Sequence, residues 1–437
     1  RIDPAFYDVE IRLLRNNFKL KLADVIEEIY RYPTFYGIEY KTEGIPVIKG
    51  ENISKDGLID EVQDFDYIDE ETNSKFHKTQ LLKGDLIFTV RGLIGKVGYF
   101  TKERGNINAN VIKIRIKEDY NSYFYWLYLN SSIGQKLIQN VTSGQVQATI
   151  TVDDILNIPI PNFDDDKEDE IIKLLESTYQ SKVLKLQQAQ KLVNGIDIIV
   201  KDELDLNYDV NQTPKSVFKI TSKQLEERID PYYYRSDFVN IIEELKSSDL
   251  KIIPFSNLID KLTNGHDSRA YKDSGTPYLK VANIRPFKYR LKDVKYVEIT
   301  NDDFSKDIDL KEDDLLITRK GTFGLVKRVD EDSDAIISSE IFRVRLKDKS
   351  LSKYLEVVLN SSIVQKQFDR VKIGAIMGSL SQSALSSVFI PLPDEDTKNR
   401  IVDKVYKNIS QADKLELEAE TEFQQAKQKV EQIILGK

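Results

Sequence analysis

The chain of 437 residues has a formal net charge of −8, and 40% of its residues are hydrophobic. It is long enough to bury more than one core, and no apolar run approaches the roughly 18 to 20 residues of a membrane span. We therefore expect a multidomain cytoplasmic protein with no membrane partner. Because the sequence has no cysteine, disulfides, thiolate zinc sites and cysteine nucleophiles are excluded.

A series of short motifs occurs twice along the chain, with the copies about 230 residues apart. The motifs are Arg-Ile-Asp-Pro at 1–4 and 228–231, Gly-x-Pro at 44–46 and 275–277, Leu-Asn-Ser-Ser-Ile at 129–133 and 359–363, and Ile-Pro-x-Pro at 158–161 and 390–393. Solenoid repeats run to roughly 20 to 50 residues, so a period this long indicates a duplicated domain. Two such modules suit a partner with two-fold symmetry, such as a DNA duplex.

Each copy begins with a short helical lead-in and continues into a β-rich stretch. Alternating or β-branched runs predict strands at 84–90, 111–116, 314–318 and 341–346. A helix carrying the Leu-Asn-Ser-Ser-Ile motif and a proline-flanked exit follow in each copy. The sequence therefore predicts an α+β fold, with one β-rich domain at 1–163 and another at 228–393.

A long helix is predicted after each exit, at 164–205 and at 394–437. Both segments open with acids, which suit the positive end of a helix dipole. Apolar residues follow at a spacing of three and four, and Lys182 interrupts the first pattern. Helices of about 50 to 60 Å cannot be covered by one small domain. We therefore expect the two helices to pair; the alternative is that each packs on its own domain. The polar segment 206–227 is the expected linker.

The negative charge lies mainly in the two helical segments. Segment 164–205 holds 11 acids and 6 bases, which gives −5, and segment 394–437 holds 10 acids and 8 bases, which gives −2. The stretch 251–393 holds 24 bases and 20 acids. The acidic total therefore does not exclude a nucleic-acid partner, whose binding surface is usually basic.

The sequence shows no catalytic constellation. Segment 92–98 has the glycines and the lysine of a phosphate loop, but Val97 stands where a serine or threonine is required, and we expect a tight turn. The two histidines, His77 and His266, have no neighbours at ligand spacing, so we expect them to lie in loops. We expect a binding protein with no catalytic and no metal-ligating residues.

Polar and basic residues recur near glycines at matched positions of the two copies. Such side chains can contact phosphates and base edges; arginine can pair with guanine and glutamine with adenine. The alternative for any one of them is a solvated strand face. The candidate DNA-binding residues are Lys49, Asn52, Arg91, Lys96, Gln145 and Gln147 in the first copy, and Lys280, Asn283, Arg285, Lys288, Arg290, Arg319, Lys320, Lys372 and Ser379 in the second.

Taken together, the order of these motifs resembles the specificity subunit of type I restriction-modification enzymes over essentially the whole chain. The resemblance rests on the following residues: the Gly-x-Pro motifs followed by Asn52-Ile53 and Asn283-Ile284, the Arg-Gly turn at 91–95 with its counterpart at 320–324, the loop 144–150, and the Ile-Pro-x-Pro exits. Each motif is weak alone, but their order, repeated twice with a long helix after each, is specific.

The resemblance implies two tandem target-recognition domains, separated by two long antiparallel coiled-coil helices in a pseudo-two-fold repeat. Each domain would read one half of a bipartite site on double-stranded DNA. The helices would set the spacer and dock two methyltransferase subunits, and restriction or translocase subunits would be further partners. The chain itself would bind no cofactor, because S-adenosylmethionine, ATP and magnesium belong to the partner subunits.

Two other functions are compatible with the sequence. Arg-Ile-Asp-Pro stretches also precede recognition domains fused behind a methyltransferase in single-chain restriction enzymes, so the chain could be the recognition half of such an enzyme. A duplicated coiled-coil scaffold that binds no DNA is the alternative from a different class. A nuclease is disfavoured, because no acids recur at matched metal-binding spacing.

Overall fold

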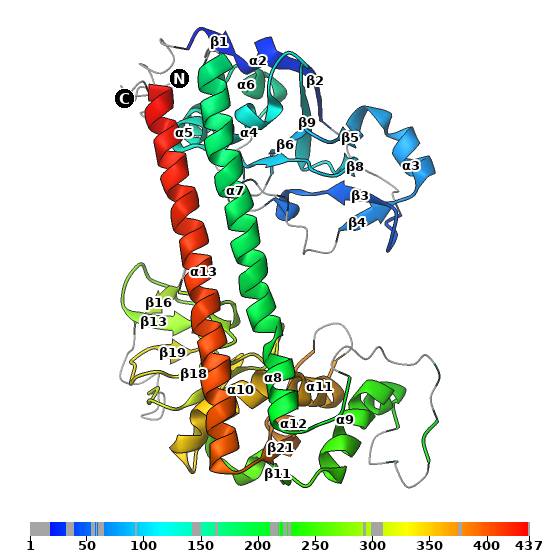
Figure 1. Cartoon of the computed structure of the whole chain (residues 1–437), viewed down its shortest axis with the longest axis vertical. Helices are drawn as coiled ribbons and strands as arrows, with labels where there is room; N and C mark the ends of the chain where they lie inside the picture. Colours follow the sequence, from blue (N-terminus) through cyan, green and yellow to red (C-terminus); the bar gives the residue numbers. More distant parts are fainter. Residues whose placement is uncertain are drawn as a thin grey trace. The chain divides into compact units, whose positions relative to one another are not determined.

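The computed structural model describes residues 18–31, 39–53, 57, 59, 65–91, 94–141, 150–161, 165–209, 217, 219–221, 225, 229–291, 294–298, 309–374 and 378–435 (Figure 1). The chain forms two compact units. Unit 1 comprises Arg1–Leu184 and Glu418–Lys437, and unit 2 comprises Lys185–Leu417. The long helices α7 (Asp165–Asn194) and α13 (Glu395–Leu435) therefore contribute residues to both units.

Unit 1 contains two four-stranded sheets, ordered β2-β9-β6-β7 and β4-β3-β8-β5. Neighbouring strands are antiparallel except for β3 and β8. The strands are β1 (Leu20–Lys21), β2 (Ile26–Arg31), β3 (Ile45–Ile48), β4 (Asp66–Ile68), β5 (Leu81–Leu82), β6 (Leu86–Thr89), β7 (Val97–Tyr99), β8 (Arg104–Ile107), β9 (Val111–Ile116) and β10 (Pro159–Ile160). The helices are α2 (Leu22–Val25), α3 (Glu70–Lys75), α4 (Ser122–Asn130), α5 (Ser132–Val141) and α6 (Val152–Leu156).

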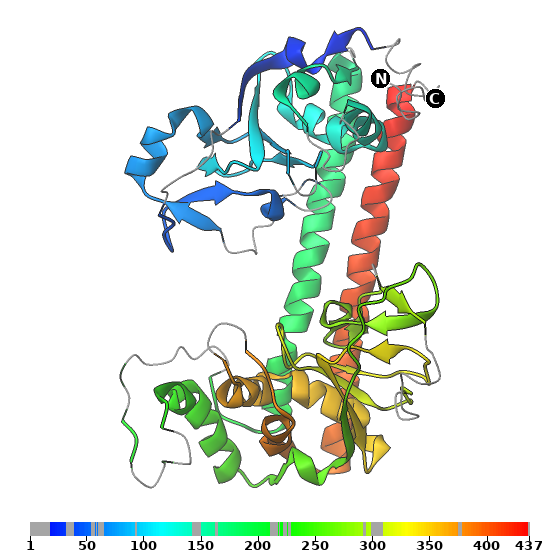
Figure 2. The same cartoon turned by 180° about the vertical axis from the view of Figure 1, so that it is seen from behind.

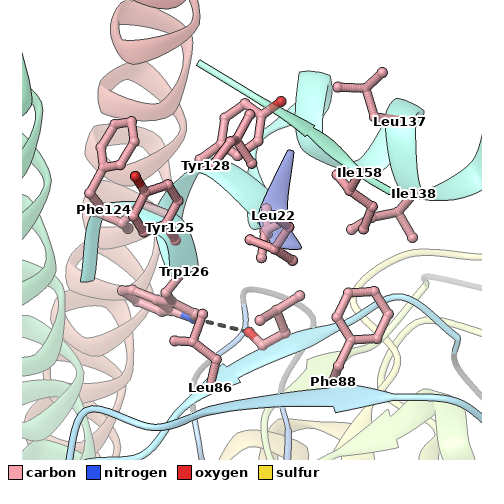
Figure 3. Packing of buried hydrophobic residues seen from close by; sticks show 14 of the residues in the cluster. Leu22, Leu86, Phe88, Phe124, Tyr125, Trp126, Tyr128, Leu137, Ile138 and Ile158 are labelled. Carbon is pink, nitrogen blue, oxygen red and sulfur yellow. Dashed lines mark hydrogen bonds between the residues drawn. The ribbon is translucent and has the colours of Figure 1, made fainter. Parts of the chain in front are cut away.

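The main core of unit 1 lies between the first sheet and helices α4 and α5. Strand β6 alternates: Leu86 and Phe88 join this core, whereas Ile87 joins a second cluster formed with the other sheet. Figure 3 shows Leu86 and Phe88 on one side of the core and Trp126 of α4 on the other. Helix α4 is buried over its run from Phe124 to Leu129, and its aromatic side chains form part of this core. Figures 1 and 2 show α4 and α5 on the side of unit 1 next to α7.

Unit 2 contains sheets ordered β12-β20-β17-β18 and β16-β13-β19, with the two-stranded pairs β14-β15 and β11-β21. The strands are β11 (Lys251–Pro254), β12 (Ile259–Asn264), β13 (Thr276–Leu279), β14 (Ile284–Arg285), β15 (Lys288–Tyr289), β16 (Lys295–Val297), β17 (Leu315–Thr318), β18 (Val326–Arg328), β19 (Ile336–Ile337), β20 (Ile341–Leu346) and β21 (Phe389–Leu392). The helices are α8 (Ile196–Glu203), α9 (Ser236–Ser247), α10 (Ser352–Asn360), α11 (Ser362–Val371) and α12 (Gln382–Ser387).

The sheets confirm the duplication that the sequence predicts. The order β12-β20-β17-β18 in unit 2 repeats the order β2-β9-β6-β7 in unit 1, and the parallel pair β13 and β19 repeats β3 and β8. The predicted strand segments contain β6, β9, β17 and β20. The prediction of an α+β fold with two β-rich domains is confirmed.

The repeated Leu-Asn-Ser-Ser-Ile motif is a break between two helices rather than part of one helix. Ser131 and Ser361 are extended, with ψ angles of 164° and 158°, so a new helix begins at the following serine in each unit. The free amides at the start of the new helix need acceptors. In unit 1 the Ser132 amide donates to Glu431 Oε1 of α13 at 2.7 Å; in unit 2 the Ser362 amide donates to Asp197 Oδ1 of α8 at 2.6 Å.

The long helices pair within unit 1, as the coiled-coil prediction requires. Lys182 of α7, which interrupts the apolar pattern, is only 6% exposed. Its ammonium group donates to Glu420 Oε2 at 2.9 Å and lies 4.4 Å from the centre of the Phe423 ring. The buried lysine is therefore accommodated by an ion pair and an aromatic face of α13.

The same helices also pair within unit 2. The Asn408 side chain donates to the Leu192 carbonyl at 3.3 Å, and Arg400 Nε donates to Glu203 at 3.0 Å. Residue numbers rise along one helix as they fall along the other, so the pairing is antiparallel. The segment predicted as one helix at 164–205 is divided into α7 and α8 at Gly195, whose backbone stays helical at φ −70° and ψ −12°.

The predicted domain boundaries differ from the limits of the compact units, because each unit includes part of both long helices. At the start of the predicted linker, Leu206 and Tyr208 are buried in the core of unit 2. Within the described residues, no helix has the length and apolar character needed to cross a membrane.

Candidate nucleic-acid interface

A tight turn between two strands recurs in both units, and it carries candidate residues. Lys96 N donates to Thr89 Oγ1 at 2.9 Å in unit 1, and Leu325 N donates to Thr318 Oγ1 at 2.9 Å in unit 2. In both turns, a glutamine of the following helix donates to the carbonyl of the glycine that ends the motif. These bonds are Gln135 Nε2 to Gly95 O, 2.9 Å, and Gln365 Nε2 to Gly324 O, 2.8 Å. The turn is thus fixed from two sides.

An ion pair supports the strand that leads into each turn. Arg115 binds Asp85 through Nε–Oδ1 at 2.8 Å and Nη2–Oδ2 at 2.7 Å. Arg345 binds Asp314 through the same atoms at the same distances. Both carboxylates also accept a backbone amide of the preceding turn, as their predicted place before a strand implies. Such bidentate pairs are strong and geometrically specific, so the two turns have the same support.

In unit 1, Arg91 has the least engaged side chain of the described candidates: it is exposed and makes no ion pair or hydrogen bond with described residues. The ammonium of Lys96 donates to the Ile53 carbonyl at 2.9 Å, and burial lowers the pKa of Lys96. Lys49 pairs with Asp66; burial acts to lower its pKa, but the ion pairs together raise it. Lys49 and Lys96 therefore have roles within the fold.

The matched asparagines Asn52 and Asn283 are buried, at 3% and 4% exposure. The side-chain oxygen of each accepts a backbone amide three residues earlier, Lys49 N or Lys280 N, at 2.9 Å in both cases. Asn283 Nδ2 also donates to the Arg290 carbonyl at 2.9 Å. This burial and bonding assign both asparagines to the framework that shapes the adjacent turn.

In unit 2 the structure brings together two candidate segments, the turn at 319–324 and the glycine-rich loop before the exit. Lys320 and Ser379 form an antiparallel bridge, and the Leu380 amide donates to the Arg319 carbonyl at 2.9 Å. The Lys372 ammonium lies 5.6 Å from the Phe323 ring centre. Arg319 lies over the Phe342 ring, and its buried Nε has no hydrogen-bond partner in the described part of the chain.

The other candidates of unit 2 lie around the hairpin β14–β15. The Lys288 ammonium binds Asp413 at 3.1 Å and Glu416 at 2.7 Å, both on α13. Burial acts to lower the pKa of Lys288, but the two carboxylates raise it overall. Arg285 donates to the Ile284 carbonyl at 2.7 Å, Lys280 lies over the Tyr271 ring, and Arg290 is exposed. Lys288 therefore fastens the hairpin to the long helix.

Sequence reasoning missed residues that the structure places beside the loop of unit 2. Tyr232 and Arg235 follow the repeated Arg-Ile-Asp-Pro motif, and Tyr232 lies 4.9 Å from Lys372. The Tyr-Tyr-Tyr-Arg run after that motif could have marked these residues as candidates. Their contact with Lys372 could not be predicted, because the two segments are far apart in the sequence.

The remaining candidates, Gln145 and Gln147, lie outside the described residues. The predicted turn at 92–98 leads into β7, which begins at Val97. Across the described ranges, no group of three or more His, Asp or Glu residues is placed to hold a metal ion. His266 is half-buried, and burial lowers its pKa.

Comparison with known proteins identifies the family. Residues 19–193 and 266–422 match the family described as type I restriction modification DNA specificity domain, and these two ranges cover more than half of the chain. No curated protein matches the chain. Since the family match falls once on each copy of the repeat, it agrees with the duplicated sheets.

Solved structures with similarity to the chain come from the same kind of system. One, from work on assembly and conformational transition of a type I R-M system, has 13% identity and a TM-score of 0.45, with 95% of each chain covered. The type I S subunit from M. genitalium has 10% identity, a TM-score of 0.42 and 96% of each chain covered. The HsdS subunit from Thermoanaerobacter tengcongensis has 13% identity, a TM-score of 0.34 and 95% of each chain covered. Given the two family matches, the chain belongs to the DNA specificity family of type I restriction-modification systems.

Proposed function

We propose that each β-rich domain of this DNA specificity protein reads one half of a bipartite site on double-stranded DNA, domain 1–163 one half and domain 228–393 the other. The observation that carries the proposal is the turn that recurs in both units with the same hydrogen bonds and presents basic residues, Arg91 in one copy and Arg319 and Lys320 in the other. Basic side chains beside glycines can approach a groove closely. A scaffold without DNA binding is disfavoured by the family match.

The polar residues of the interface have different roles in this proposal. Arg91, Arg319, Lys320, Arg290, Lys372 and Ser379 are the candidates for direct contact with DNA. Asn52, Asn283, Lys49, Lys96 and Lys288 hold the turns and the hairpin in place. Gln145 and Gln147 remain predicted contacts with bases.

The long helices are proposed to set the length of the unread spacer and to dock two methyltransferase subunits, with restriction or translocase subunits as further partners. Helix α13 has 41 residues, which corresponds to about 60 Å at a rise of 1.5 Å per residue. The antiparallel pairing inside each unit supports the proposal, because a paired helix resists bending and compression. The chain carries no catalysis of its own, and S-adenosylmethionine, ATP and magnesium would bind to the partners.

A domain exchange tests the division into half-sites. Residues 34–157 are replaced by the equivalent segment of another family member, and adenine methylation is mapped after assembly with the methyltransferase. One half of the recognised sequence should change while the other half and the spacer stay the same. A change in both halves would contradict the assignment of one half-site to each domain.

The spacer is tested by inserting four residues after Ala189, which adds about 6 Å of helix and exceeds one turn only slightly. The recognised halves should remain, with a spacer longer by about one or two base pairs of roughly 3.4 Å. An unchanged spacer in a folded, active complex would leave the helices as a docking surface only.

A further inference from the structure

The lead-in of unit 2 begins with a segment to which the proposed function gives no role. The 3-10 helix at Pro231–Tyr234 starts at Asp230, whose Oδ1 accepts the Tyr233 amide at 3.1 Å. Tyr233 and Tyr234 are buried, at 8% and 2% exposure, whereas Tyr232 is 36% exposed. The segment is therefore anchored by two of its tyrosines and presents the third at the surface.

Tyr232 joins the lead-in to the loop that bears Lys372. Its ring centre lies 4.9 Å from Arg235 Cζ and 4.9 Å from Lys372 Nζ, so two cations contact one aromatic ring. Lys372 also contacts Phe323 of the repeated turn. Burial acts to lower the pKa of Lys372, but its contacts with the Tyr232 hydroxyl and Asp369 raise it, so the lysine stays charged at neutral pH.

Arg235 is held in one orientation with part of its guanidinium free. Its Nε and Nη2 donate to the two oxygens of Asp237 at 3.1 and 2.8 Å, and Asp237 is only 4% exposed. Within the described part of the chain, Nη1 has no hydrogen bond. A planar guanidinium fixed on one edge and open on another suits an oxygen anion such as a phosphate.

The surrounding charge favours the same ligand. The lead-in, the loop and the turn together contribute four cationic side chains: Arg235, Lys372, Lys320 and Arg319. Two of these cations are paired with carboxylates, Arg235 with Asp237 and Lys372 with Asp369. The first copy lacks both new groups, because Ala5 and Asp8 stand at the positions that match Tyr232 and Arg235 after the Arg-Ile-Asp-Pro motif.

We propose that Tyr232, Arg235 and Lys372 form a contact with the phosphodiester backbone of DNA that unit 2 makes and unit 1 does not. The proposal rests on the proposed function, because it assumes that unit 2 binds a DNA half-site. Phosphate contacts position a protein on the duplex and add affinity that does not depend on sequence. The second half-site would therefore be held by an additional contact.

The test uses the full chain and measures binding by fluorescence anisotropy at several salt concentrations. One duplex contains the recognised sequence, as identified by the methylation map, and a second duplex of equal length has random sequence. Arg235→Gln should weaken binding about tenfold on both duplexes and reduce the slope of log K against log salt by about one. Combining Tyr232→Ala with Arg235→Asp, which introduces the residues of the first copy, should give a larger loss.

Two variants keep the test decisive. Combining Arg235→Gln with Asp237→Asn removes the ion pair as a whole, so no buried carboxylate is left unpaired, and it should show the same loss. Lys246→Gln is the matched control, because it removes one positive charge from α9, where the lysine lies 5.5 Å from the centre of the Phe389 ring. The affinity of this variant for both duplexes should equal that of the wild type.

The possible failures point to different conclusions. Wild-type affinity and slope in the folded Arg235 and Asp237 double variant would overturn the phosphate contact. A loss confined to the specific duplex would also overturn it, because it would make Arg235 a reader of bases. If the wild-type chain, with or without its methyltransferase, does not distinguish the two duplexes, the proposed function fails rather than this inference.

Discussion

Units 1 and 2 share a framework but differ in how the domain is fastened to the long helix that leaves it. Asn130 and Asn360 make matched bonds to the first residues of β7 and β18, so the residues four positions earlier, Trp126 and Glu356, are equivalent. In unit 1, Trp126 donates to the carbonyls of Val97 and Gly57 at 2.9 and 3.0 Å; Figure 3 shows one of these bonds. Its ring meets that of Tyr179 on α7, with centres 6.2 Å apart.

The equivalent position in unit 2 is a buried charge. Glu356 is 1% exposed; it accepts the Arg328 amide at 2.7 Å and the hydroxyl of Tyr406 on α13, and Lys327 lies 3.8 Å away. In unit 1, a cavity of about 460 Å³ lies beside Trp126 and is lined by Tyr99, Tyr123 and residues of α7. The two domains thus share the hydrogen bonds that shape the turns. They differ in the contact with the long helix, which is apolar in unit 1 and is made by a buried carboxyl group in unit 2.

The largest expected effect comes from replacing Trp126 of unit 1 with glutamate, the residue at the equivalent position of unit 2. Trp126→Glu removes an indole with two hydrogen bonds and places a carboxylate in the hydrophobic core of unit 1, so we expect unit 1 to lose about 4 to 5 kcal/mol. Hydrogen exchange resolved by segment measures this loss. Trp126→Phe, which keeps an aromatic ring, is the control and should lose less. If the glutamate cost under about 1 kcal/mol, the apolar character of this fastening would be refuted.

Removing the charge in unit 2 ranks second. Glu356→Ala leaves the Arg328 amide and the Tyr406 hydroxyl without their acceptor, which should cost unit 2 about 3 to 4 kcal/mol. Trp126 is the single tryptophan and reports on unit 1. In urea its fluorescence transition should stay near that of the wild type, while amide protection falls in α10 and β18. Equal losses in both units would contradict separate fastenings.

The shared framework should respond equally in both units. Asp85→Ala and Asp314→Ala each remove the partner of a bidentate arginine, and we expect about 2 to 3 kcal/mol from each in its own unit. Amide exchange in β6 and β17 measures the two effects. Losses that differ by more than about 1 kcal/mol would show that the framework also diverged.

A smaller effect is expected at the acids that cap α5 and α11. Glu431→Ala and Asp197→Ala each remove an acceptor for a helix amide, which typically costs about 1 kcal/mol. The double variant tests additivity, since the two sites belong to different units. Asp197→Asn keeps an acceptor and avoids the cost of burial that raises the pKa of Asp197, so it should cost less than the alanine. An alanine variant with unchanged stability would contradict the claim that these acids stabilise the starts of α5 and α11.

The smallest effect is a pH dependence confined to unit 2. Burial raises the pKa of Glu356 above its ordinary value of 4.5, although Lys327, Tyr406 and Arg328 oppose this shift. A carboxyl with a raised folded-state pKa stabilises most below pH 4.5 and loses that contribution as the pH rises through its folded value. Relative to Glu356→Gln, the wild type should therefore lose stability in unit 2 across this window. A wild type that gains stability relative to Glu356→Gln as the pH rises would contradict this direction.

Several features of the molecule were determined by the sequence alone. The long motif period predicted the duplication, short β-branched runs predicted β6, β9, β17 and β20, and the 3-4 apolar spacing predicted the long helices. These features depend on residues close together in the chain, where side-chain spacing and local backbone preference decide the element. The resemblance to type I specificity subunits rested on the order of such local signals.

Only the tertiary structure decided which of the polar candidates are exposed and which are buried or paired within the fold. Asn52 and Asn283 were expected as contacts, yet packing encloses them as caps, and Lys288 binds acids of α13 that lie more than 120 positions away. The capping of Ser132 by Glu431 joins residues 299 positions apart. Spacing along the chain carries no information on such pairs, because burial and the free energy of satisfying buried polar groups settle them after the elements pack.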